Sequence, residues 1–446
     1  MDNTAIARQI ETLAGKFCSQ STPGFALLIG EKGKMLYKNG FGMADLVKSV
    51  PVTPEHSFLI GSVSKQFTTM AVMMLQERGL LAYDEPIARF FPDFPAYKDV
   101  VTIRHLMTHT AGIKEYLVDA FWQQPAAERA QVTQDSLLQL IGGWGELDFA
   151  PGTRFSYSNS GYVMLGSIVE QLSGQSFASF ITERIFRPLG MKHSFVPESP
   201  AQPAGNRAFG YQVGMEGTFI PAPYDMTTIG WADGNIVSTV DDLFIWHNAL
   251  NSETLVSQKT LAEAFTPYVL KNGRSTNYGF GWVNYLRRGV PEIWHSGSTA
   301  GYIARFSRFV ASDTAVIMLT NYQGINRDEL FGGIVDTILG SEMAPVGTMS
   351  LPAADLAVKA GIYAEGAEKI CLRYDPERKK LLLNGATRRL SGEYSLSPVS
   401  EKMFRVDSPA DYYVSFSAGG NPPSGLELIC NGMLVNLARQ AEQPQG

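Results

Sequence analysis

A serine and a lysine three residues apart carry the clearest chemical signal of this sequence. Ser62 and Lys65 lie in the stretch Phe-Leu-Ile-Gly-Ser-Val-Ser-Lys at residues 58–65, where a short apolar run ends at Gly61. Apolar residues then recur at helical spacing over residues 67–75, which predicts a buried helix that starts near the serine. Because residues three apart share one face of a helix, the lysine amine can reach the serine hydroxyl.

A serine hydroxyl becomes a strong nucleophile when a neighbouring base takes its proton, and a lysine desolvated by burial can be that base. The start of the helix would add N–H donors where an oxyanion forms. The pair therefore predicts nucleophilic catalysis by Ser62 with Lys65 as its base. Ser64 is the nearest rival, but it has no lysine three residues later. The alternative without chemistry is a capped helix with an ordinary lysine.

A Tyr-x-Asn triplet supplies a second candidate group. Tyr157 and Asn159 follow a Pro-Gly turn and precede a predicted helix, so we expect them on the loop where that helix begins. A tyrosine oxygen near an ammonium can relay the serine proton, and an amide beside it can hold a substrate carbonyl. The triplet alone is weak, because the sequence repeats it at residues 37–39 in a predicted hairpin.

A third motif, His295-Ser-Gly297-Ser298, ends a predicted strand. Gly297 would allow the backbone to approach a ligand closely. A backbone N–H in this segment could join that of Ser62 in an oxyanion hole, and an extended substrate could pair with the strand edge. A lone histidine before a glycine is more simply structural, and its place after the first two motifs gives it functional weight.

Composition narrows the classes of partner. The chain has 446 residues, 45% of them hydrophobic, so it can bury a large core in two domains. Its net charge of −6, without a basic run, excludes nucleic acid and anionic membrane as expected partners and leaves a small molecule or short peptide. We find neither a signal-peptide pattern nor eighteen consecutive apolar residues and expect a soluble, cytoplasmic protein. We interpret the three cysteines as reduced structural thiols.

The predicted elements form an α+β fold around these motifs. A helix at residues 6–17 and a hairpin at residues 24–38 precede the serine, and a mainly helical segment follows it. The first and last thirds of this part would share one antiparallel sheet flanked by helices, with a helical subdomain inserted and a cleft at the seam. Further helices are predicted at residues 104–108, 134–141, 161–172, 177–185, 240–250 and 327–339, and further strands at residues 278–283, 292–295, 302–309 and 315–319.

The last hundred residues have a different pattern. Residues 341–352 resemble a linker, and short strands separated by turns follow them. We therefore predict a catalytic domain at residues 1–340, a linker at 341–352, and a small all-β barrel or sandwich at 353–446. Its predicted strands cover residues 369–374, 380–383, 404–406, 412–416, 425–430 and 433–437.

Taken together, Ser-x-x-Lys, Tyr-x-Asn and His-x-Gly in this order resemble the penicillin-recognising serine hydrolases. The most similar branch contains class C β-lactamases, D-alanyl carboxypeptidases, D-aminopeptidases and family VIII esterases. The resemblance covers roughly residues 5–340, and the tail more weakly resembles the lipocalin-like β domains of some D-aminopeptidase-like relatives. Supporting phrases lie at residues 105–113, 151–162, 186–191 and 234–243.

The resemblance implies a β-lactamase/transpeptidase-like fold and an acyl-enzyme mechanism without cofactor or metal. Ser62 would attack the carbonyl, while Lys65 and Tyr157 would move protons as a coupled pair. Asn159 would help to hold the substrate. The N–H groups of Ser62 and Ser298 would receive the oxyanion.

The sequence departs from the family pattern at His295. β-Lactamases and carboxypeptidases of the group usually have a lysine there, whose permanent charge suits a substrate carboxylate. Histidine therefore favours amides or short peptides, including those with D-amino acids, and leaves a family VIII-type esterase or a weak β-lactamase as alternatives. An aminopeptidase also needs an acidic group for the substrate amine, and Glu115 and Asp233 are candidates.

Three further alternatives remain open at this point. His105 and His109 are four residues apart and could face one metal, but the glutamate of the His-Glu-x-x-His pattern is missing, so we expect one to cap a helix and the other to pack. The chain could instead be a peptide-binding module on a hydrolase fold, although its intact Ser62, Lys65 and Tyr157 argue against that. Self-association into a homo-oligomer is also open.

Overall fold

The structure is a computed structural model of the whole chain. It folds as two compact units, one made of Met1–Asn284 and Glu292–Ile325 and the other of Tyr285–Pro291 and Asn326–Gly446. The residues it describes are 3–117, 128, 132–198, 205–214, 217–222, 231–343, 349–366, 368–387, 390–407, 412–417, 422–430 and 433–440.

A six-stranded sheet in the order β2-β1-β12-β11-β10-β9 organises the first unit. Strand β1 pairs with both β2 and β12, so the early strands lie beside the late ones, as predicted. Strands β11 and β12 are buried along their whole length. In β12 this burial matches a continuous apolar run from Ala315 to Leu319, whereas β11 also buries Arg305 and Arg308. The strands are β1 (Phe25–Glu31), β2 (Lys34–Phe41), β9 (Val283–Arg287), β10 (Val290–Thr299), β11 (Tyr302–Phe309) and β12 (Thr314–Thr320).

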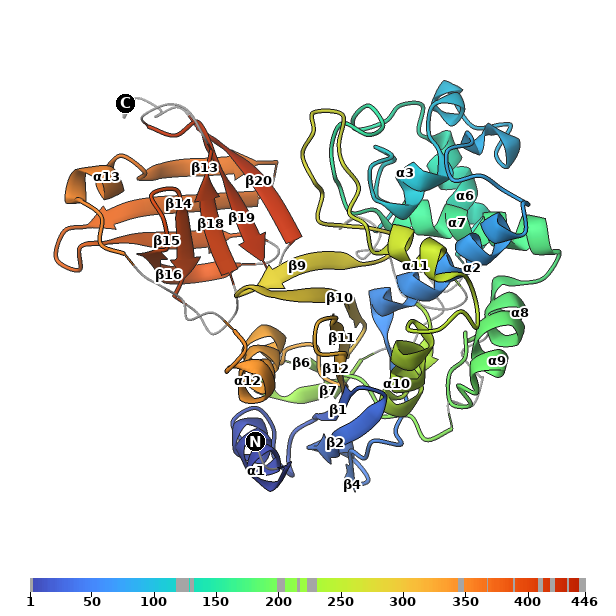
Figure 1. Cartoon of the computed structure of the whole chain (residues 1–446), viewed down its shortest axis with the longest axis horizontal. Coiled ribbons are helices and arrows are strands. Elements are labelled where there is room, and N and C mark those ends of the chain that lie inside the picture. The colour runs from blue at the N-terminus through green and yellow to red at the C-terminus, as the bar shows by residue number, and fades with distance from the viewer. Residues whose placement is uncertain are drawn as a thin grey trace. The chain divides into compact units, whose positions relative to one another are not determined.

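Helices inserted between β2 and β9 form a layer beside this sheet (Figure 1). Helix α2 packs on α7, and α7 also contacts α3, α6 and α8. Helix α10 covers β1 and β12, where Gly30 admits the ring of Phe244, since a Cβ on Gly30 would lie 2.1 Å from that ring. The α-helices are α1 (Asn3–Ala14), α2 (Lys65–Glu77), α3 (Ile103–Met107), α6 (Gln134–Gly143), α7 (Asn159–Ser173), α8 (Phe177–Ile181), α9 (Arg187–Leu189), α10 (Val240–Ala249) and α11 (Gln258–Ala264).

Shorter elements connect the helices and the sheet. The helix predicted at residues 177–185 continues as a π-helical turn, η4, and then as α9. The short helices are η1 (Gly61–Ser64), η2 (Ile87–Arg89), η3 (Ala96–Asp99) and η4 (Thr182–Phe186), and the short strands are β3 (Met43–Asp45), β4 (Val50–Pro51), β5 (Phe58–Leu59), β6 (Tyr211–Val213), β7 (Phe219–Pro221) and β8 (Val237–Ser238).

The strand predicted at residues 278–283 is wrong over most of its length, because β9 begins only at Val283. Gly281 explains the difference. It has a φ of +79°, and a Cβ there would lie 3.0 Å from the carbonyl oxygen of Lys65. Glycine thus allows this segment to turn against the start of α2 instead of extending.

A closed antiparallel barrel of eight strands forms most of the second unit. Each strand pairs with the next, and β20 closes on β13, so the barrel has no free edge. Alternate side chains point inward, as in β18 and β19. The strands are β13 (Gly361–Glu365), β14 (Glu368–Asp375), β15 (Lys380–Ala386), β16 (Ser391–Pro398), β17 (Met403–Val406), β18 (Tyr412–Phe416), β19 (Gly425–Cys430) and β20 (Met433–Arg439).

Helices α12 (Arg327–Leu339) and α13 (Ala353–Ala357) belong to the same unit as the barrel. The Tyr412 hydroxyl of β18 donates to the carboxylate of Asp328 on α12, which also pairs with Arg327. This unit thus begins before residue 340. The domain boundary at 340 stays a prediction, and residues 344–348 of the predicted linker lie outside the described residues.

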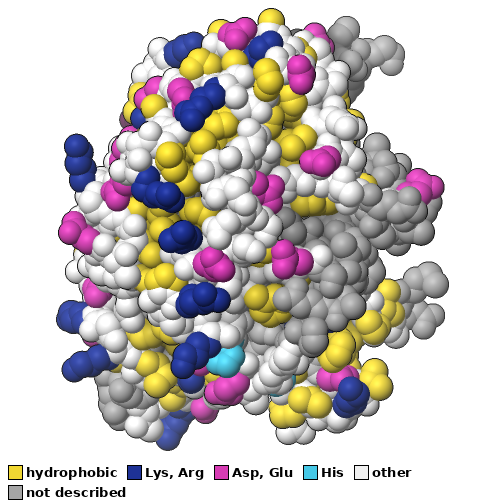
Figure 2. Space-filling view, turned by 90° about the vertical axis from the view of Figure 1, so that its right-hand side faces the viewer, with side chains coloured by type: hydrophobic (Ala, Val, Ile, Leu, Met, Phe, Trp, Pro, Cys, Tyr) yellow, Lys and Arg dark blue, Asp and Glu magenta, His cyan; other side chains and the backbone are white. Residues whose placement is uncertain are grey.

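The described surface carries both signs of charge. On the face that Figure 2 shows, Lys and Arg are interspersed with Asp and Glu among hydrophobic side chains, in keeping with 37 basic and 43 acidic residues. Among the described helices, none combines the length and the apolar character needed to cross a membrane. The cytoplasmic location stays a prediction.

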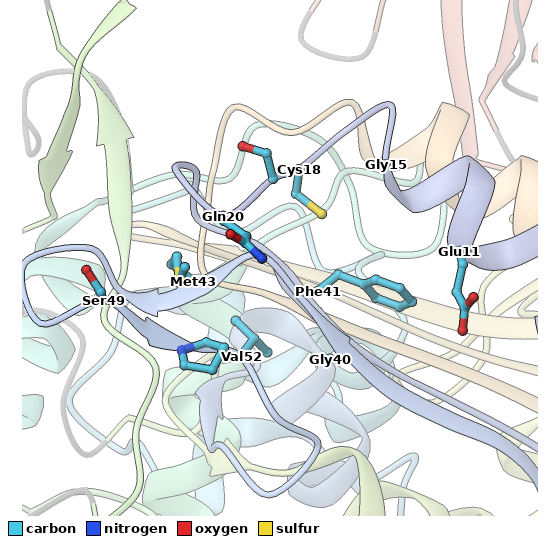
Figure 3. A pocket seen from close by; sticks show the side chains of 12 residues that line it. Glu11, Gly15, Cys18, Gln20, Gly40, Phe41, Met43, Ser49 and Val52 are labelled. Atoms are coloured by element: carbon cyan, nitrogen blue, oxygen red, sulfur yellow. The ribbon is translucent and has the colours of Figure 1, made fainter.

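An open groove of about 600 Å³ lies between the end of α1 and the strands that follow it (Figure 3). Glu11 of α1 and Cys18 of the next loop face Phe41 and Val52 across it. The residues predicted to do chemistry are absent from its lining. This groove is therefore separate from the candidate active site.

Candidate active site

Lys65 lies at the centre of the predicted site. Its side chain is 0% exposed, and its Nζ donates to the Oγ of Ser62 at 3.1 Å. The same nitrogen donates to Oδ1 of Asn159 at 2.7 Å and to the carbonyl oxygen of Asp233 at 2.5 Å. Three acceptors thus match the three donors of a lysine ammonium. The structure places Ser62, Lys65 and Asn159 together, as the motifs predict.

The rival serine is held elsewhere. The Oγ of Ser64 accepts a hydrogen bond at 3.0 Å from the backbone N–H of Ile236, and the side chain is buried. Thr68, one helical turn later, donates to the carbonyl of Ala232 at 2.5 Å. These two contacts fix the segment on either side of Asp233 against α2. Ser64 therefore helps to position the carbonyl that Lys65 binds.

Tyr157 lies on the loop before α7 and faces the same lysine. The Nζ of Lys65 is 4.9 Å from the centroid of the Tyr157 ring. Asn159 is the first residue of α7, which points its amide back toward Lys65. The prediction that this triplet lies on a loop at the start of a helix is confirmed.

Two glycines let strand β10 meet the start of η1. A Cβ on Gly297 would lie 2.8 Å from the backbone nitrogen of Ser62, and a Cβ on Gly61 would lie 2.7 Å from that of Ser298. Gly61 also has a φ of +53°, a conformation that favours glycine. The N–H groups of Ser62 and Ser298 thus lie near each other, as an oxyanion hole requires. Their role stays a prediction.

His295 is bound on both sides of its ring. It is 4% exposed, its Nδ1 lies 2.6 Å from the carbonyl oxygen of Ser296, and its Nε2 lies 2.9 Å from the hydroxyl of Tyr278. A carbonyl only accepts, so Nδ1 carries a proton and donates it to Ser296, and Nε2 shares a hydrogen bond with the hydroxyl of Tyr278. Burial holds the pKa of Tyr278 well above its usual value, so its hydroxyl keeps its proton. The predicted contact of His295 with substrate stays a prediction.

Both acidic candidates are linked to Lys65: Glu115 binds the backbone of its partner Asn159, and Asp233 binds Lys65 through its own carbonyl. Glu115 is half-buried, and its carboxylate accepts from the backbone N–H groups of Leu117 and Asn159. Burial raises the pKa of Glu115, and these two hydrogen bonds oppose the rise. Asp233 is 5% exposed, and its Oδ2 accepts from the hydroxyl of Tyr116 at 2.9 Å. Burial also raises the pKa of Asp233. Glu115 is the more accessible of the two.

His105 and His109 each use Nδ1 to accept a hydrogen bond from a backbone N–H. His105 lies in α3, and its Nδ1 accepts from the backbone N–H of Thr102 in a capping box. His109 follows the helix, and its Nδ1 accepts from the backbone N–H of Ser158 at 3.1 Å. The described residues hold no group of three or more His, Cys, Asp and Glu side chains suited to a metal ion. His109 is a neighbour of the site that the motifs alone did not identify.

The capping role of His105 predicts a pH dependence of stability. Burial lowers the pKa of His105 to about 4, from a usual value near 6.5. Between pH 6.5 and 4, His105 is protonated in the unfolded chain but stays neutral in the folded chain. The contribution of neutral His105 to the free energy of unfolding is therefore complete above pH 6.5 and is lost as the pH falls toward 4. Glutamine in place of His105 keeps a capping box but does not titrate. Between pH 6.5 and 4 we therefore expect the free energy of unfolding to fall less for His105→Gln than for the unmodified chain, with a difference of at most about 3 kcal/mol.

Urea unfolding at pH 7, 5.5 and 4.5 measures this difference. His247, whose pKa burial also lowers to about 4, is present in both proteins, so its contribution cancels in the comparison. Equal pH slopes for the two proteins would contradict the capping role of a neutral His105.

Comparisons with known proteins agree with this geometry. A family model described as Beta-lactamase matches residues 5–336. The chain is similar to "Penicillin-binding protein 4*" of Bacillus subtilis, with 32% identity over 325 residues that cover 70% of each chain. It is also similar to a D-aminopeptidase of Cereibacter sphaeroides, with 26% identity over 404 residues, 87% of this chain and 74% of the relative.

A solved structure extends the likeness to the barrel. The structure of "the octameric penicillin-binding protein homologue from Pyrococcus abyssi" superposes with a TM-score of 0.67 at 25% identity and covers 98% of this chain and 100% of its own. The resemblance inferred from the three motifs is thereby confirmed, and the binding-module alternative is not supported. The chain belongs to the Beta-lactamase family and is a serine hydrolase.

Proposed function

We propose that this hydrolase cleaves the amide bond of amino-acid amides or short peptides that carry a free α-amino group, with D-configured acyl residues as the preferred class. One observation carries the proposal: the carboxylate of Glu115, a half-buried residue, is hydrogen-bonded to the backbone of Asn159, whose side chain binds Lys65 beside Ser62. The likeness to a D-aminopeptidase over 87% of the chain supports the D-configured class.

The proposed acylation follows from the three partners of Lys65. As a neutral amine, Lys65 would donate its two N–H groups to Asn159 and to the carbonyl of Asp233, and its lone pair would face the Ser62 hydroxyl. The amine takes the serine proton as Oγ bonds to the substrate carbonyl carbon, and the N–H groups of Ser62 and Ser298 hold the resulting oxyanion.

The rest of the cycle uses the same groups. The proton passes through the coupled pair of Lys65 and Tyr157 to the leaving amine, the C–N bond breaks, and an ester to Ser62 remains. Water then gives a proton to this pair and attacks the ester. The acid is released, and Ser62 regains its proton.

Glu115 would hold the α-ammonium of the substrate. The substrate α-nitrogen lies two bonds from the carbonyl carbon. With the substrate carbonyl near the Asn159 amide, this nitrogen can approach the Glu115 carboxylate, which is bound to the backbone N–H of Asn159. A substrate cation would also favour the ionised form of Glu115, whose pKa is raised by burial. The substrate charge would thus add to that of Lys65 in stabilising the ionised carboxylate.

The competing β-lactamase activity has less support at His295. Both of its ring nitrogens are engaged within the protein, at Ser296 and Tyr278, whereas a substrate carboxylate needs a cation that is available to it. A short-chain esterase remains the second candidate, because the same acyl-enzyme steps cleave an ester. The two candidates differ in whether the free α-amino group of the substrate is recognised: the proposed amidase requires it and the esterase does not.

A panel of substrates tests the proposal. We expect D-phenylalanine anilide to be cleaved faster than its L form, its N-acetyl derivative, a short-chain ester and a chromogenic cephalosporin. Glu115→Gln should raise KM for the free amine at least about tenfold and leave the N-acetyl substrate unchanged. Glu146→Gln, on the exposed Glu146, is the matched control.

Two outcomes would overturn the proposal. Equal cleavage of the free and N-acetylated anilides would remove recognition of the amine. Faster turnover of the ester or the cephalosporin, with no amide cleavage, would favour the alternatives.

Self-association also stays a proposal, supported by the homologue described as octameric, and light scattering of the purified chain tests it.

A further inference from the structure

We propose that His109 is a positioning residue that clamps the loop around Tyr157 and sets its phenol ring over Lys65. This inference rests on the role proposed for Tyr157 in moving the serine proton. His109 is 2% exposed, and it lies between the catalytic loop and the aromatic residues behind it.

Both chain neighbours of Tyr157 are hydrogen-bonded to His109. The backbone N–H of Ser156 donates to the carbonyl of His109 at 2.9 Å, and that of Ser158 donates to its Nδ1 at 3.1 Å. His109 itself has a φ of +57°, in the left-handed region that residues with a side chain seldom adopt. This backbone conformation is maintained at a cost, as is common for residues beside functional sites.

The imidazole ring supports Tyr157 from behind. The centroids of the His109 and Tyr157 rings are 4.2 Å apart with 34° between the planes. Tyr278 lies 4.7 Å and Tyr162 5.0 Å from the same imidazole. On the catalytic side, the Nζ of Lys65 is 4.9 Å from the Tyr157 centroid. His109 thus fixes both the backbone and the ring plane of Tyr157.

The clamp requires a neutral imidazole. Because Nδ1 of His109 accepts from an N–H, the ring proton must be on Nε2, and a second proton would set two donors against each other. Burial, together with the charges of Lys65 and His295, holds the pKa of His109 well below its usual value. His109 is therefore neutral at neutral pH, as the clamp requires.

Two substitutions separate the two halves of the clamp. His109→Asn keeps a short acceptor and tolerates a positive φ, but it removes the ring. His109→Phe keeps a ring but removes the acceptor for Ser158. We expect each to lower kcat about tenfold or more with little change in KM, since the clamp acts on proton transfer and does not touch the substrate.

The Tyr157→Phe background provides the deciding measurement. In this background there is no phenol hydroxyl to place. Adding either His109 substitution should therefore lower kcat by less than about a further twofold. Phe155→Leu, which alters an aromatic neighbour of His109, is the matched packing control. It should lower kcat by the same factor whether residue 157 is tyrosine or has been changed by Tyr157→Phe. Thermal unfolding and circular dichroism confirm that each variant is folded.

The readout is the rate at which a fluorophosphonate labels Ser62, with steady-state kinetics beside it. Labelling needs no amide substrate, so a failure of the proposed substrate class leaves this test readable. Equal losses in the Tyr157 and Tyr157→Phe backgrounds would make His109 a general packing residue and overturn the inference. Unchanged labelling in both His109 variants would overturn it too.

Discussion

Ser62→Ala should abolish turnover, lowering kcat by more than about 10⁴-fold, and should abolish covalent labelling while the protein remains folded. The hydroxyl that Lys65 binds at 3.1 Å is the proposed nucleophile, and no other group is proposed to form the acyl-enzyme. Lys65 keeps Asn159 and the carbonyl of Asp233 as acceptors, so the buried amine is not left unpaired. Intact-protein mass spectrometry after exposure to a fluorophosphonate measures the label, and thermal unfolding measures the fold.

Ser64→Ala is the matched control for this experiment. It removes the acceptor of the Ile236 N–H inside the core, so it should reduce the free energy of unfolding by about 1–3 kcal/mol. It should still be labelled, because Ser62 and Lys65 remain in place. A labelled Ser62→Ala together with an unlabelled Ser64→Ala would reverse the assignment of the nucleophile.

The parts of the site that were predictable from sequence rest on local geometry or on motif order. Ser62 and Lys65 meet because their spacing puts them on one helical face. Tyr157 and Asn159 were placed by their motif and by the helix signal that follows them. The shared sheet followed from apolar runs at both ends of the catalytic part, and β1 does pair with β12.

Other parts depend on contacts between distant residues that no local pattern encodes. Lys65 binds the backbone carbonyl of Asp233, to which any residue type could contribute. His109 contacts Ser158 from a left-handed conformation that spacing does not reveal. In the barrel, β16 was missed because its sequence is largely polar and gives little apolar alternation. Such elements are fixed by tertiary packing rather than by their own sequence.

Lys65→Ala and Tyr157→Phe should each lower kcat about 10²-fold or more, and the double variant should lose much less than the product of the two. The reason is that both groups are proposed to move the same proton, and groups that act as a unit are not additive. Lys65→Ala also leaves the Asn159 amide oxygen and the Asp233 carbonyl without this donor, so its stability should fall. Single-turnover acylation rates, measured at saturating substrate, isolate the chemical step.

Tyr162→Phe is the control that distinguishes loss of the Tyr157 hydroxyl from a general disturbance of the aromatic residues around Lys65. Its ring centroid lies 5.1 Å from the Lys65 nitrogen, close to the 4.9 Å of Tyr157, but its hydroxyl donates to the carbonyl of Met107 inside the core. This variant should therefore lose stability and keep most of its acylation rate, whereas Tyr157→Phe should do the reverse. Independent, multiplicative losses for Lys65→Ala and Tyr157→Phe would show that the two residues act in separate steps, with Tyr157 then assigned to protonation of the leaving amine alone.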